Sequence, residues 1–254
     1  MNNTVIGSTD EQPFLLWRGG LWKKGRKTDM DKMELMKARH SVRQYTDTPL
    51  EEAVINALEK EIAACNDAGG LHIQLVKNEP KAFNGFMAHY GKFSGVTNYI
   101  ALIGPKNAGL DEACGYYGER LVLKAQELGL NTCWVALTYK KVPSAFEIRR
   151  GEKLALVIAI GYGKTQGAAR KSKTPAEVSN VTADSPQWFK DGVEAALLAP
   201  TAVNQQQFRL TLENGAVEAK ALRGVCAKVD LGIVKYHFEL AAGRENFKWA
   251  SPNT

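Results

Sequence analysis

The sequence predicts an α+β fold of two related halves in one chain, in each of which helices flank a central β-sheet. Apolar residues recur at helical spacing in some segments, and short apolar runs typical of strands lie between these segments. A helix, a turn of small residues and a strand at residues 55–76 recur in the same order at residues 189–212. This recurrence indicates a diverged duplication, although the order helix, turn, strand is also common in unrelated proteins.

The predicted elements of the first half have recognisable boundaries. One helix is expected at residues 29–37, and a second begins at Pro49, whose fixed φ suits a first helical position, and ends near Asn66. A third helix covers residues 113–128 and stops at Gly129. Strands are predicted at residues 71–76, 98–103, 132–137 and 154–160. The last strand is apolar throughout, so we expect it in the centre of the sheet, covered on both faces.

A polar connection leads to the second half. Residues 164–181 are rich in Lys, Ser and Thr and contain Pro175, which is typical of a long surface connection. Pro186 then opens a helix, a strand covers residues 208–212, and a last helix spans about residues 230–242.

The chain is expected to have three parts, beginning with a basic leader. Residues 1–28 form a flexible leader, residues 29–175 the first half, and residues 176–254 a second, smaller half. Five basic and two acidic residues give the leader +3 of the net charge of +6. A basic tract could bind nucleic acid or an anionic membrane, but this one lacks an apolar helical stripe and is rich in glycine. We therefore expect neither of these partners.

Composition excludes several further classes of protein. The 254 residues are 44% hydrophobic and 24% charged, which is ordinary for a globular protein. No apolar run approaches the roughly 20 residues of a membrane-spanning helix, and no signal-peptide pattern is present, so a cytoplasmic location is expected. The four cysteines are scattered singly, which favours reduced thiols over a disulfide framework or a zinc site, and no metal is expected.

The first candidate motif is the run Arg39-His40-Ser41-Val42-Arg43. In an extended stretch the side chains of Arg39, Ser41 and Arg43 would point the same way, so one ligand could meet all three. Guanidinium groups bind phosphate through paired hydrogen bonds. On charge alone, a solvated basic helix end would be the favoured interpretation.

The second candidate motif, at residues 199–208, is rich in amides and carries no charge. It reads Ala-Pro-Thr-Ala-Val-Asn-Gln-Gln-Gln-Phe and lies between a helix and a strand. Asn and Gln offer both donors and acceptors, which match the imide edge and ribityl hydroxyls of a flavin better than a phosphate. Taken singly, a polar loop with a helix-stopping proline explains the segment at least as well.

Together, the two motifs resemble those of FMN-dependent nitroreductases. Residues 39–43 resemble the family signature Arg-Arg/His-Ser-x-Arg/Lys, and residues 200–208 resemble its turn Pro-Ser-x-x-Asn-x-Gln-Pro-Trp. Residues 115–136 look like the family's helix and following strand, and the strand that ends in Gly-Tyr-Gly at residues 161–163 is similar to its central strand. In ordinary members the turn follows the signature by about one helix, whereas here it lies beyond a complete first unit.

The resemblance over residues 33–242 is therefore to the subgroup in which one chain mimics the usual dimer, the TM nitroreductase type. It implies a nitroreductase-like fold with mainly antiparallel sheets. At residues 65–71, the equivalent of the turn in the first half, the chain lacks the family's Pro, Ser and Gln-Pro-Trp, and the second half lacks an arginine signature. The resemblance thus implies one FMN per chain, in a monomer that mimics a dimer, with further self-association left open.

The resemblance also implies which residues bind FMN. Arg39 and Ser41 would hold the phosphate and nearby ribityl oxygens, and Arg43 would approach the pyrimidine edge near N1 and O2. Asn204 and a neighbouring glutamine, best matched by Gln206, would face the ribityl chain and ring from the other half. The remaining candidates are His40, Trp134, the backbone of Ala136 and Leu137 near N5 and O4, and the phosphate clamp Lys171 and Lys173, to which Arg170 is an alternative.

The implied activity is that of an FMN-dependent oxidoreductase. It would use NADH or NADPH to reduce a small electron-poor acceptor, nitroaromatic- or quinone-like, by a ping-pong mechanism. Because flavin N5 carries the hydride, no catalytic side chain is assigned, and the four histidines are expected to be surface or packing residues. The alternative is a degenerate flavin-binding sensor or scaffold without turnover.

Overall fold

The computed structural model describes residues 14–18, 21–25 and 31–250. The chain divides into two units, residues 1–31 and residues 32–254. The first unit contains an antiparallel hairpin of β1 (Phe14–Arg18) and β2 (Leu21–Gly25). No strand is predicted from the sequence of this segment, so the hairpin differs from the prediction. The flexibility of the leader stays a prediction, and the other residues of the leader lie outside the described ranges.

The first sheet of the second unit is antiparallel, with the strand order β3-β4-β6-β5. Its strands are β3 (Gln74–Val76), β4 (Asn98–Pro105), β5 (Asn131–Val135) and β6 (Glu152–Gly161). All four predicted strands are present, and β6 lies inside the sheet, as its apolar sequence predicts. β3 begins later than predicted, because the Asn66 side chain pairs with both backbone groups of Ile73.

The helices of the first half are α1 (Lys32–Ala38), α2 (Glu52–Gly69), α3 (Phe86–Tyr90) and α4 (Leu110–Glu127), and a 3-10 turn, η1 (Pro80–Phe83), precedes α3. The predicted start of the second helix at Pro49 is wrong. Glu51 is extended, and α2 begins at Glu52, just before Val54 and Ile55 reach the core, because packing decides where a turn of helix becomes stable. Gly129, with φ +78°, follows the end of α4 as predicted.

Alternate residues of the first sheet enter two hydrophobic clusters. On one face Ile100 and Ile158 pack with residues of α2 and α4. On the other face Tyr99 and Val157 pack with Phe83 and other residues of the segment between β3 and β4. The prediction that the central strand is covered on both faces is therefore confirmed.

The second half contains a narrower sheet. Its elements are α5 (Pro175–Val178), α6 (Gln187–Leu198), β7 (Phe208–Glu213), β8 (Ala216–Ala221), α7 (Ala227–Ala242) and β9 (Lys248–Trp249). β8 pairs antiparallel with β7 and parallel with β9. The predicted polar connection is present, the predicted strand is β7, and the two predicted helices are α6 and α7. α5, β8 and β9 are not among the predicted elements.

The two halves share one order of elements. The first contains α2-β3-β4-α4-β5, and the second contains α6-β7-β8-α7-β9. β4 and β5 are parallel to each other, since both are antiparallel to β6, and β8 and β9 are parallel too. The sheets differ in that β6 separates β4 from β5, whereas β8 and β9 are direct neighbours. This recurrence supports the predicted duplication.

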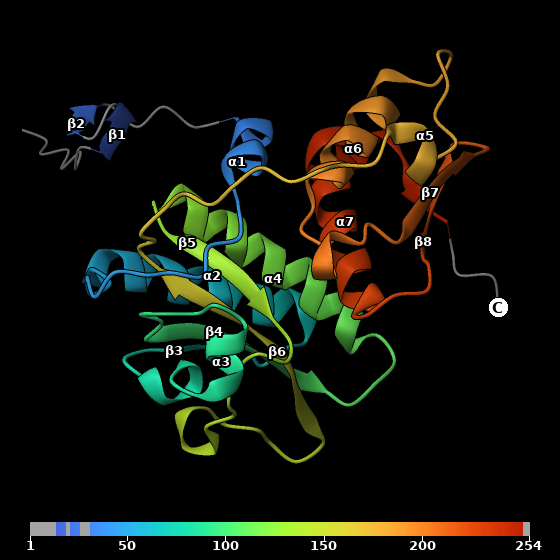
Figure 1. The fold of residues 1–254 in the computed structure, drawn as a ribbon. Coiled ribbons are helices and arrows are strands. Elements are labelled where there is room, and N and C mark those ends of the chain that lie inside the picture. Colours follow the sequence, from blue (N-terminus) through green and yellow to red (C-terminus); the bar gives the residue numbers. More distant parts are fainter. Residues whose placement is uncertain (1–13, 19–20, 26–30, 251–254) are drawn as a thin grey trace, which may run out of the picture. The chain divides into compact units, whose positions relative to one another are not determined.

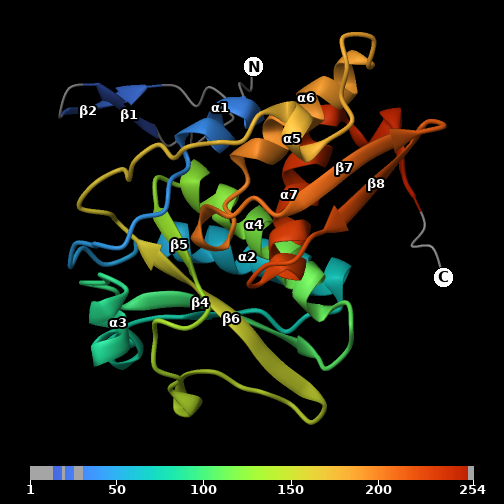
Figure 2. The same ribbon diagram turned by 45° about the vertical axis from the view of Figure 1, so that its right-hand side comes forward.

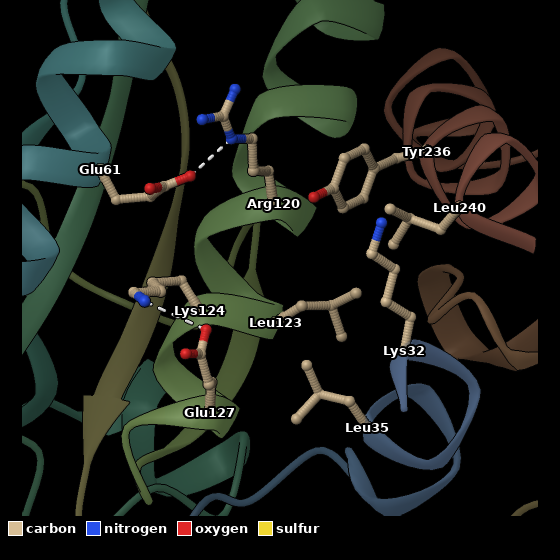
Figure 3. Close-up of a pocket in the computed structure, with 9 residues that line it drawn as sticks. All are labelled: Lys32, Leu35, Glu61, Arg120, Leu123, Lys124, Glu127, Tyr236 and Leu240. Carbon is tan, nitrogen blue, oxygen red and sulfur yellow. Dashed lines mark hydrogen bonds and ion pairs between the residues drawn. The ribbon is translucent and has the colours of Figure 1, made fainter. Parts of the chain in front are cut away.

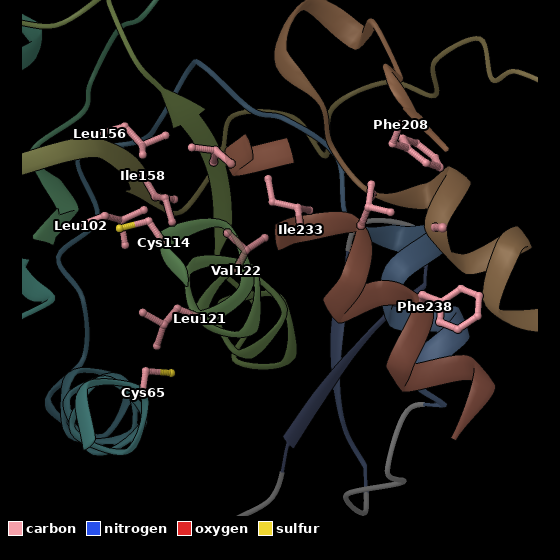
Figure 4. Close-up of a cluster of buried hydrophobic side chains, with 14 of the residues drawn as sticks. Cys65, Leu102, Cys114, Leu121, Val122, Leu156, Ile158, Phe208, Ile233 and Phe238 are labelled. Carbon is pink, nitrogen blue, oxygen red and sulfur yellow. The ribbon is translucent and has the colours of Figure 1, made fainter. Parts of the chain in front are cut away.

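One hydrophobic core joins the halves. It runs from Cys65 on α2 through Leu121 on α4 to Ile233 and Phe238 on α7 (Figure 4). In Figures 1 and 2, α4 and α7 lie between the first sheet and the β7–β8 hairpin. None of the helices in the described ranges combines the length and apolar character needed to cross a membrane.

The crossing of α4 and α7 is close because each helix carries a glycine there. A Cβ added at Gly115 would lie 2.0 Å from the carbonyl oxygen of Val229. One added at Gly232 would lie 2.0 Å from the carbonyl oxygen of Glu112. The backbones of the two halves therefore touch directly at this crossing.

Candidate functional site

Arg39, the first residue after α1, is buried, with 3% of its surface exposed. Its Nε lies 3.8 Å from Oε1 of Glu119 on α4, which makes an ion pair beyond hydrogen-bonding distance, and this Nε has no hydrogen-bond partner. Burial lowers the pKa of the guanidinium group, and Glu119 opposes that effect. A buried cation with an unused donor is a group that an anionic ligand would satisfy.

Ser41 and Arg43 lie beside the start of β5. Ser41 forms a parallel bridge with Thr132, and the backbone N–H of Val42 donates to the Thr132 carbonyl oxygen at 3.0 Å. Ser41 and Arg43 are exposed, whereas Val42 between them is buried. These two side chains are therefore open to a ligand, while Arg39, which precedes the bridge, is enclosed beside Glu119.

The connection after β6 packs against the arginine segment. Gly167, with φ +78°, lies so close to His40 that an added Cβ would be 2.5 Å from the Cβ of His40. His40 is half-buried, and burial, together with the charges of Arg39 and Arg170, lowers the pKa of its imidazole. Glycine at this position thus lets the connection lie directly on the predicted phosphate-binding segment.

Arg170 ties the same connection to the second half. Its Nη2 donates to the carbonyl oxygens of Leu197 and Ala199 at the end of α6, at 3.1 and 2.6 Å. Its Nε is buried without a hydrogen-bond partner, and burial and the charge of Arg39 lower its pKa to about 10. Arg39 and Arg170 therefore form a positive cluster that the single charge of Glu119 does not neutralise.

The turn between α6 and β7 brings four predicted residues together. Buried Gln206 accepts from the backbone N–H of Lys173 at 2.9 Å, and its Nε2 donates to Asn204 Oδ1 and to the carbonyl oxygen of Lys171, each at 3.1 Å. Asn204 Nδ2 donates to the same Lys171 carbonyl at 2.8 Å. Lys173 Nζ donates to the Gln206 carbonyl at 2.8 Å, whereas Lys171 is exposed. Lys171 is thus better placed than Lys173 to meet a ligand.

This turn has an uncommon backbone that Asp230 holds in place. Three of its residues have φ between +45° and +55°, a region that favours glycine: Val203, Asn204 and Gln206. The carboxylate of Asp230 on α7 accepts from the backbone N–H of Ala202 at 3.0 Å and from Gln205 Nε2 at 2.8 Å. Burial raises the pKa of Asp230 to about 6, and these bonds oppose the rise. Surrounding contacts thus stabilise a strained conformation.

The three predicted residues at the end of β5 differ in their surroundings. The indole N–H of Trp134 donates to Glu119 Oε2 at 2.9 Å. A Cβ added at Gly118 on α4 would lie 2.4 Å from the Trp134 ring. Trp134 therefore packs on α4. Ala136 and Leu137 are exposed, so a ligand could reach their backbone groups.

An apolar surface lies near this end of β5. α3 ends beside it, since a Cβ on Gly91 would be 2.7 Å from the Cβ of Thr138. Phe86 and Tyr90, one turn apart on α3, are 83% and 76% exposed, and Leu137 is 73% exposed. Such exposed apolar side chains often mark a binding surface.

Three residues that hold these segments together are not among the predicted site residues: Glu119, Asp230 and His237. Glu119 lies on the buried face of α4 next to Leu121. A charged residue in the apolar stripe of a helix was the signal that could have identified it. The roles of Asp230 and His237 depend on contacts between distant segments and leave no local signal.

The arginine cluster fits the phosphate of FMN. Arg39 and Arg170 each hold a buried Nε without a partner, and their mutual repulsion favours an anion. The hydroxyl of exposed Ser41 and the ammonium of exposed Lys171 would add further donors. Within the described ranges, no group of three or more His, Cys, Asp or Glu side chains is arranged to hold a metal ion.

A separate pocket of about 200 Å³ lies among α1, α2, α4 and α7 (Figure 3). Its lining residues are Lys32, Leu35, Glu61, Arg120, Leu123, Lys124, Glu127, Tyr236 and Leu240. Arg120 is paired with Glu61, and Lys124 is paired with Glu127, so most of its charges are already matched. None of the predicted cofactor-binding residues lines this pocket.

Comparison with known proteins supports the family resemblance. The model of the family described as putative TM nitroreductase matches residues 31–242. The chain is similar to a putative nitroreductase from Thermotoga maritima, with 24% identity, 87% of each chain covered and a TM-score of 0.61. It is also similar to a nitroreductase-like protein from Streptococcus mutans, with 16% identity over 60% of this chain and 98% of that one, and a TM-score of 0.50. None of the curated proteins matches it.

A third similar structure is a putative nitroreductase from Desulfovibrio desulfuricans in complex with FMN, with 19% identity over 63% of this chain and 99% of that one, and a TM-score of 0.48. The family model extends across both halves of the chain. The family model and the similarity to the Thermotoga maritima structure confirm the predicted nitroreductase-like α+β fold. The chain belongs to the putative TM nitroreductase family and is accordingly an oxidoreductase.

Proposed function

We propose that the chain binds one FMN and uses NADH or NADPH to reduce a small electron-poor acceptor, nitroaromatic- or quinone-like. One observation carries the proposal. Residues 167–173 contact His40 in the arginine motif and Asn204 and Gln206 in the amide motif. Two motifs that lie far apart in sequence are thus linked by one basic segment, as a shared ligand would require.

The phosphate would bind to the arginine cluster. Arg39 and Arg170 offer unused donors, and Ser41 and Lys171 are exposed nearby in the chain segments that hold them. A charge-assisted hydrogen bond contributes roughly 1.5–3 kcal/mol, and an anion would also relieve the repulsion between the two guanidinium groups. Lys173 would act indirectly, by fixing the backbone of the amide turn.

The ring would lie toward β5. Exposed Arg43 would place a positive charge near the pyrimidine edge, where negative charge develops on reduction. Backbone groups of Ala136 and Leu137 would orient the ring. Bound FMN supplies the electron-accepting chemistry, so the chain needs to position and polarise it rather than provide an acid or base.

The apolar surface near the end of β5 would receive the acceptor. Phe86, Tyr90 and Leu137 present flat or apolar groups there. If the nicotinamide and the acceptor use the same open face, each must leave before the other binds, which gives ping-pong kinetics. The recurrence of elements in the two halves supports a monomer whose second half takes the place of a second subunit.

The first test is an absorbance spectrum of the purified full chain with and without added FMN. We expect a yellow protein whose flavin absorbance is bleached by NADH or NADPH without oxygen and restored by a quinone. Arg39→Ala should lose FMN on gel filtration, because the phosphate loses charge-assisted bonds. Arg149→Ala, which changes an exposed arginine before β6, is the control and should retain it.

Two other results would contradict part or all of this proposal. Bound flavin that neither nucleotide reduces would indicate the sensor or scaffold function. A colourless protein that ignores added FMN would contradict the whole proposal.

A further inference from the structure

A buried network joins the two halves beside Arg39. Glu119 on α4 and His237 on α7 are both 0% exposed, and Glu119 Oε1 lies 2.9 Å from His237 Nε2. Glu119 Oε2 accepts from the indole of Trp134, and His237 Nδ1 lies 3.1 Å from the carbonyl oxygen of Ala195 on α6. Three elements, α4, β5 and α7, thus meet at one carboxyl group, and His237 links it to α6.

The geometry requires a shared proton between Glu119 and His237. The carbonyl oxygen of Ala195 can only accept, so Nδ1 of His237 carries a hydrogen. The contact between Nε2 and Glu119 then needs one more proton, on either the imidazole or the carboxyl group. Without it, a nitrogen lone pair would face a carboxylate at 2.9 Å, and the two groups would repel each other.

The same carboxyl group sets the position of Arg39. The oxygen that contacts His237 is the one that lies 3.8 Å from Arg39 Nε. Because both oxygens of Glu119 have fixed partners, the group cannot rotate to follow Arg39. It attracts the guanidinium group by charge and leaves its Nε without a hydrogen bond.

We infer that Glu119, held by His237, is a positioning residue that aligns Arg39 for the phosphate of FMN, and that the proton shared with His237 makes FMN affinity depend on pH. This inference rests on the proposed function. Glu119 acts through Arg39 and does not itself touch the cofactor. A rise in pH that removes the shared proton breaks the hydrogen bond between Glu119 and His237, so that the carboxyl group is no longer held in place beside Arg39.

The other titratable groups around this pair do not explain such a pH dependence. They are Arg39, His40, Cys133, Arg170 and Tyr236. Burial raises the pKa of Cys133 and of Tyr236, so both stay neutral near pH 7 and above. The pKa of His40 is lowered, so its imidazole is also neutral there, and Arg170, whose pKa is about 10, stays charged up to about pH 8.

Glu119→Gln is the sharpest test, because it keeps the hydrogen bonds and removes the charge. The amide oxygen can accept from Trp134, and the amide nitrogen can donate to Nε2 of a neutral His237. Removal of a negative charge near a phosphate would by itself strengthen binding, whereas loss of positioning weakens it. We expect FMN binding weaker by roughly tenfold. Glu127→Gln, the same change farther along α4 at a residue paired with Lys124, is the matched control and should bind as the unchanged chain does.

A pH series separates positioning from general packing. FMN dissociation constants would be measured by flavin fluorescence from about pH 6 to about pH 8, below the range in which Arg170 loses its charge. The unchanged chain and Glu127→Gln should lose affinity toward high pH, whereas Glu119→Gln should show no such loss. His237→Gln, whose amide donates to Glu119 without titrating, should bind FMN within about twofold of the unchanged chain near pH 6 and also keep its affinity at high pH. Ionisation of the phosphate, with a pKa near 6, affects all variants alike.

The outcomes distinguish this inference from the proposed function. An unchanged chain that does not bind FMN would overturn the proposed function and this inference with it. FMN binding by the unchanged chain, with Glu119→Gln equally tight or tighter, would overturn the inference alone. Circular dichroism shows whether Glu119→Gln folds. If it does not, the inference is tested by comparing how FMN affinity depends on pH in His237→Gln and in the unchanged chain. Parallel pH profiles for these two proteins would refute the shared-proton mechanism.

Discussion

Asp230 stabilises a strained turn, and its contribution to the stability of the folded protein depends on pH. Burial raises its pKa from 3.8 to about 6, even though the carboxylate accepts bonds from Ala202 and Gln205. The folded protein therefore keeps a proton that the unfolded chain releases between about pH 4 and about pH 6. The stability that this group contributes is complete below about pH 4 and is lost as the pH rises through about 6.

Asp230→Asn should abolish that loss, because its amide oxygen, in the place of Oδ2, can accept from Ala202 and Gln205 without ionising. Between about pH 4 and about pH 7, the free energy of unfolding of the unchanged chain should fall by about 2 kcal/mol more than that of the variant. Urea denaturation at several pH values measures the difference. Asp184→Asn, at an exposed site, should follow the unchanged chain. Parallel curves for Asp230→Asn and the unchanged chain would refute the argument.

The site residues that sequence could identify are those in local motifs. Arg39, Ser41 and Arg43 stand within five residues, and Asn204 and Gln206 lie in one turn, so their residue types and spacing are visible in the chain. Glu119 and His237 are 118 positions apart and meet only because α4 crosses α7. No pattern in either helix indicates that contact. The enclosed position of Arg39 likewise depends on tertiary packing, which residue spacing does not describe.

At the scale of elements, the crossing of α4 and α7 depends on glycine. Gly115→Ala should destabilise the protein, since the new Cβ would meet the Val229 carbonyl oxygen at 2.0 Å and force the helices apart. The expected cost is about 1–3 kcal/mol, larger than the gain in helix propensity. Thermal unfolding followed by circular dichroism measures it. Gly85→Ala, where no atom lies within 4 Å of the added Cβ, is the matched control. An unchanged or higher melting temperature for Gly115→Ala would show that the crossing of α4 and α7 can accommodate the added methyl group.

Elements with strong local signals could be predicted, and elements that depend on a partner could not. β6 is apolar throughout residues 154–160, and α4 is followed by a glycine, so both were evident. β8 alternates alanine and valine with glutamate and lysine, which are weak strand formers, and it is ordered through pairing with β7. β9 has only two residues, Lys248 and Trp249, and too short a pattern to recognise.

For the whole molecule, the asymmetry of the halves predicts the amount of flavin. The first half carries the arginine motif and the second the amide motif, and nothing separates β8 from β9 as β6 separates β4 from β5. At saturation we expect one FMN per chain, measured as flavin released from a known amount of protein. Two per chain would mean that both pseudo-symmetric sites bind, and one per two chains would mean that a site forms between molecules.

The connection from β6 to α6 places both motifs on a single polypeptide. Subunits that share a site dissociate when the protein is diluted, whereas two parts of one chain keep a constant effective concentration with respect to each other. Binding of the cofactor at such a site would therefore not depend on the concentration of the protein, so even a few copies in a cell could each bind it.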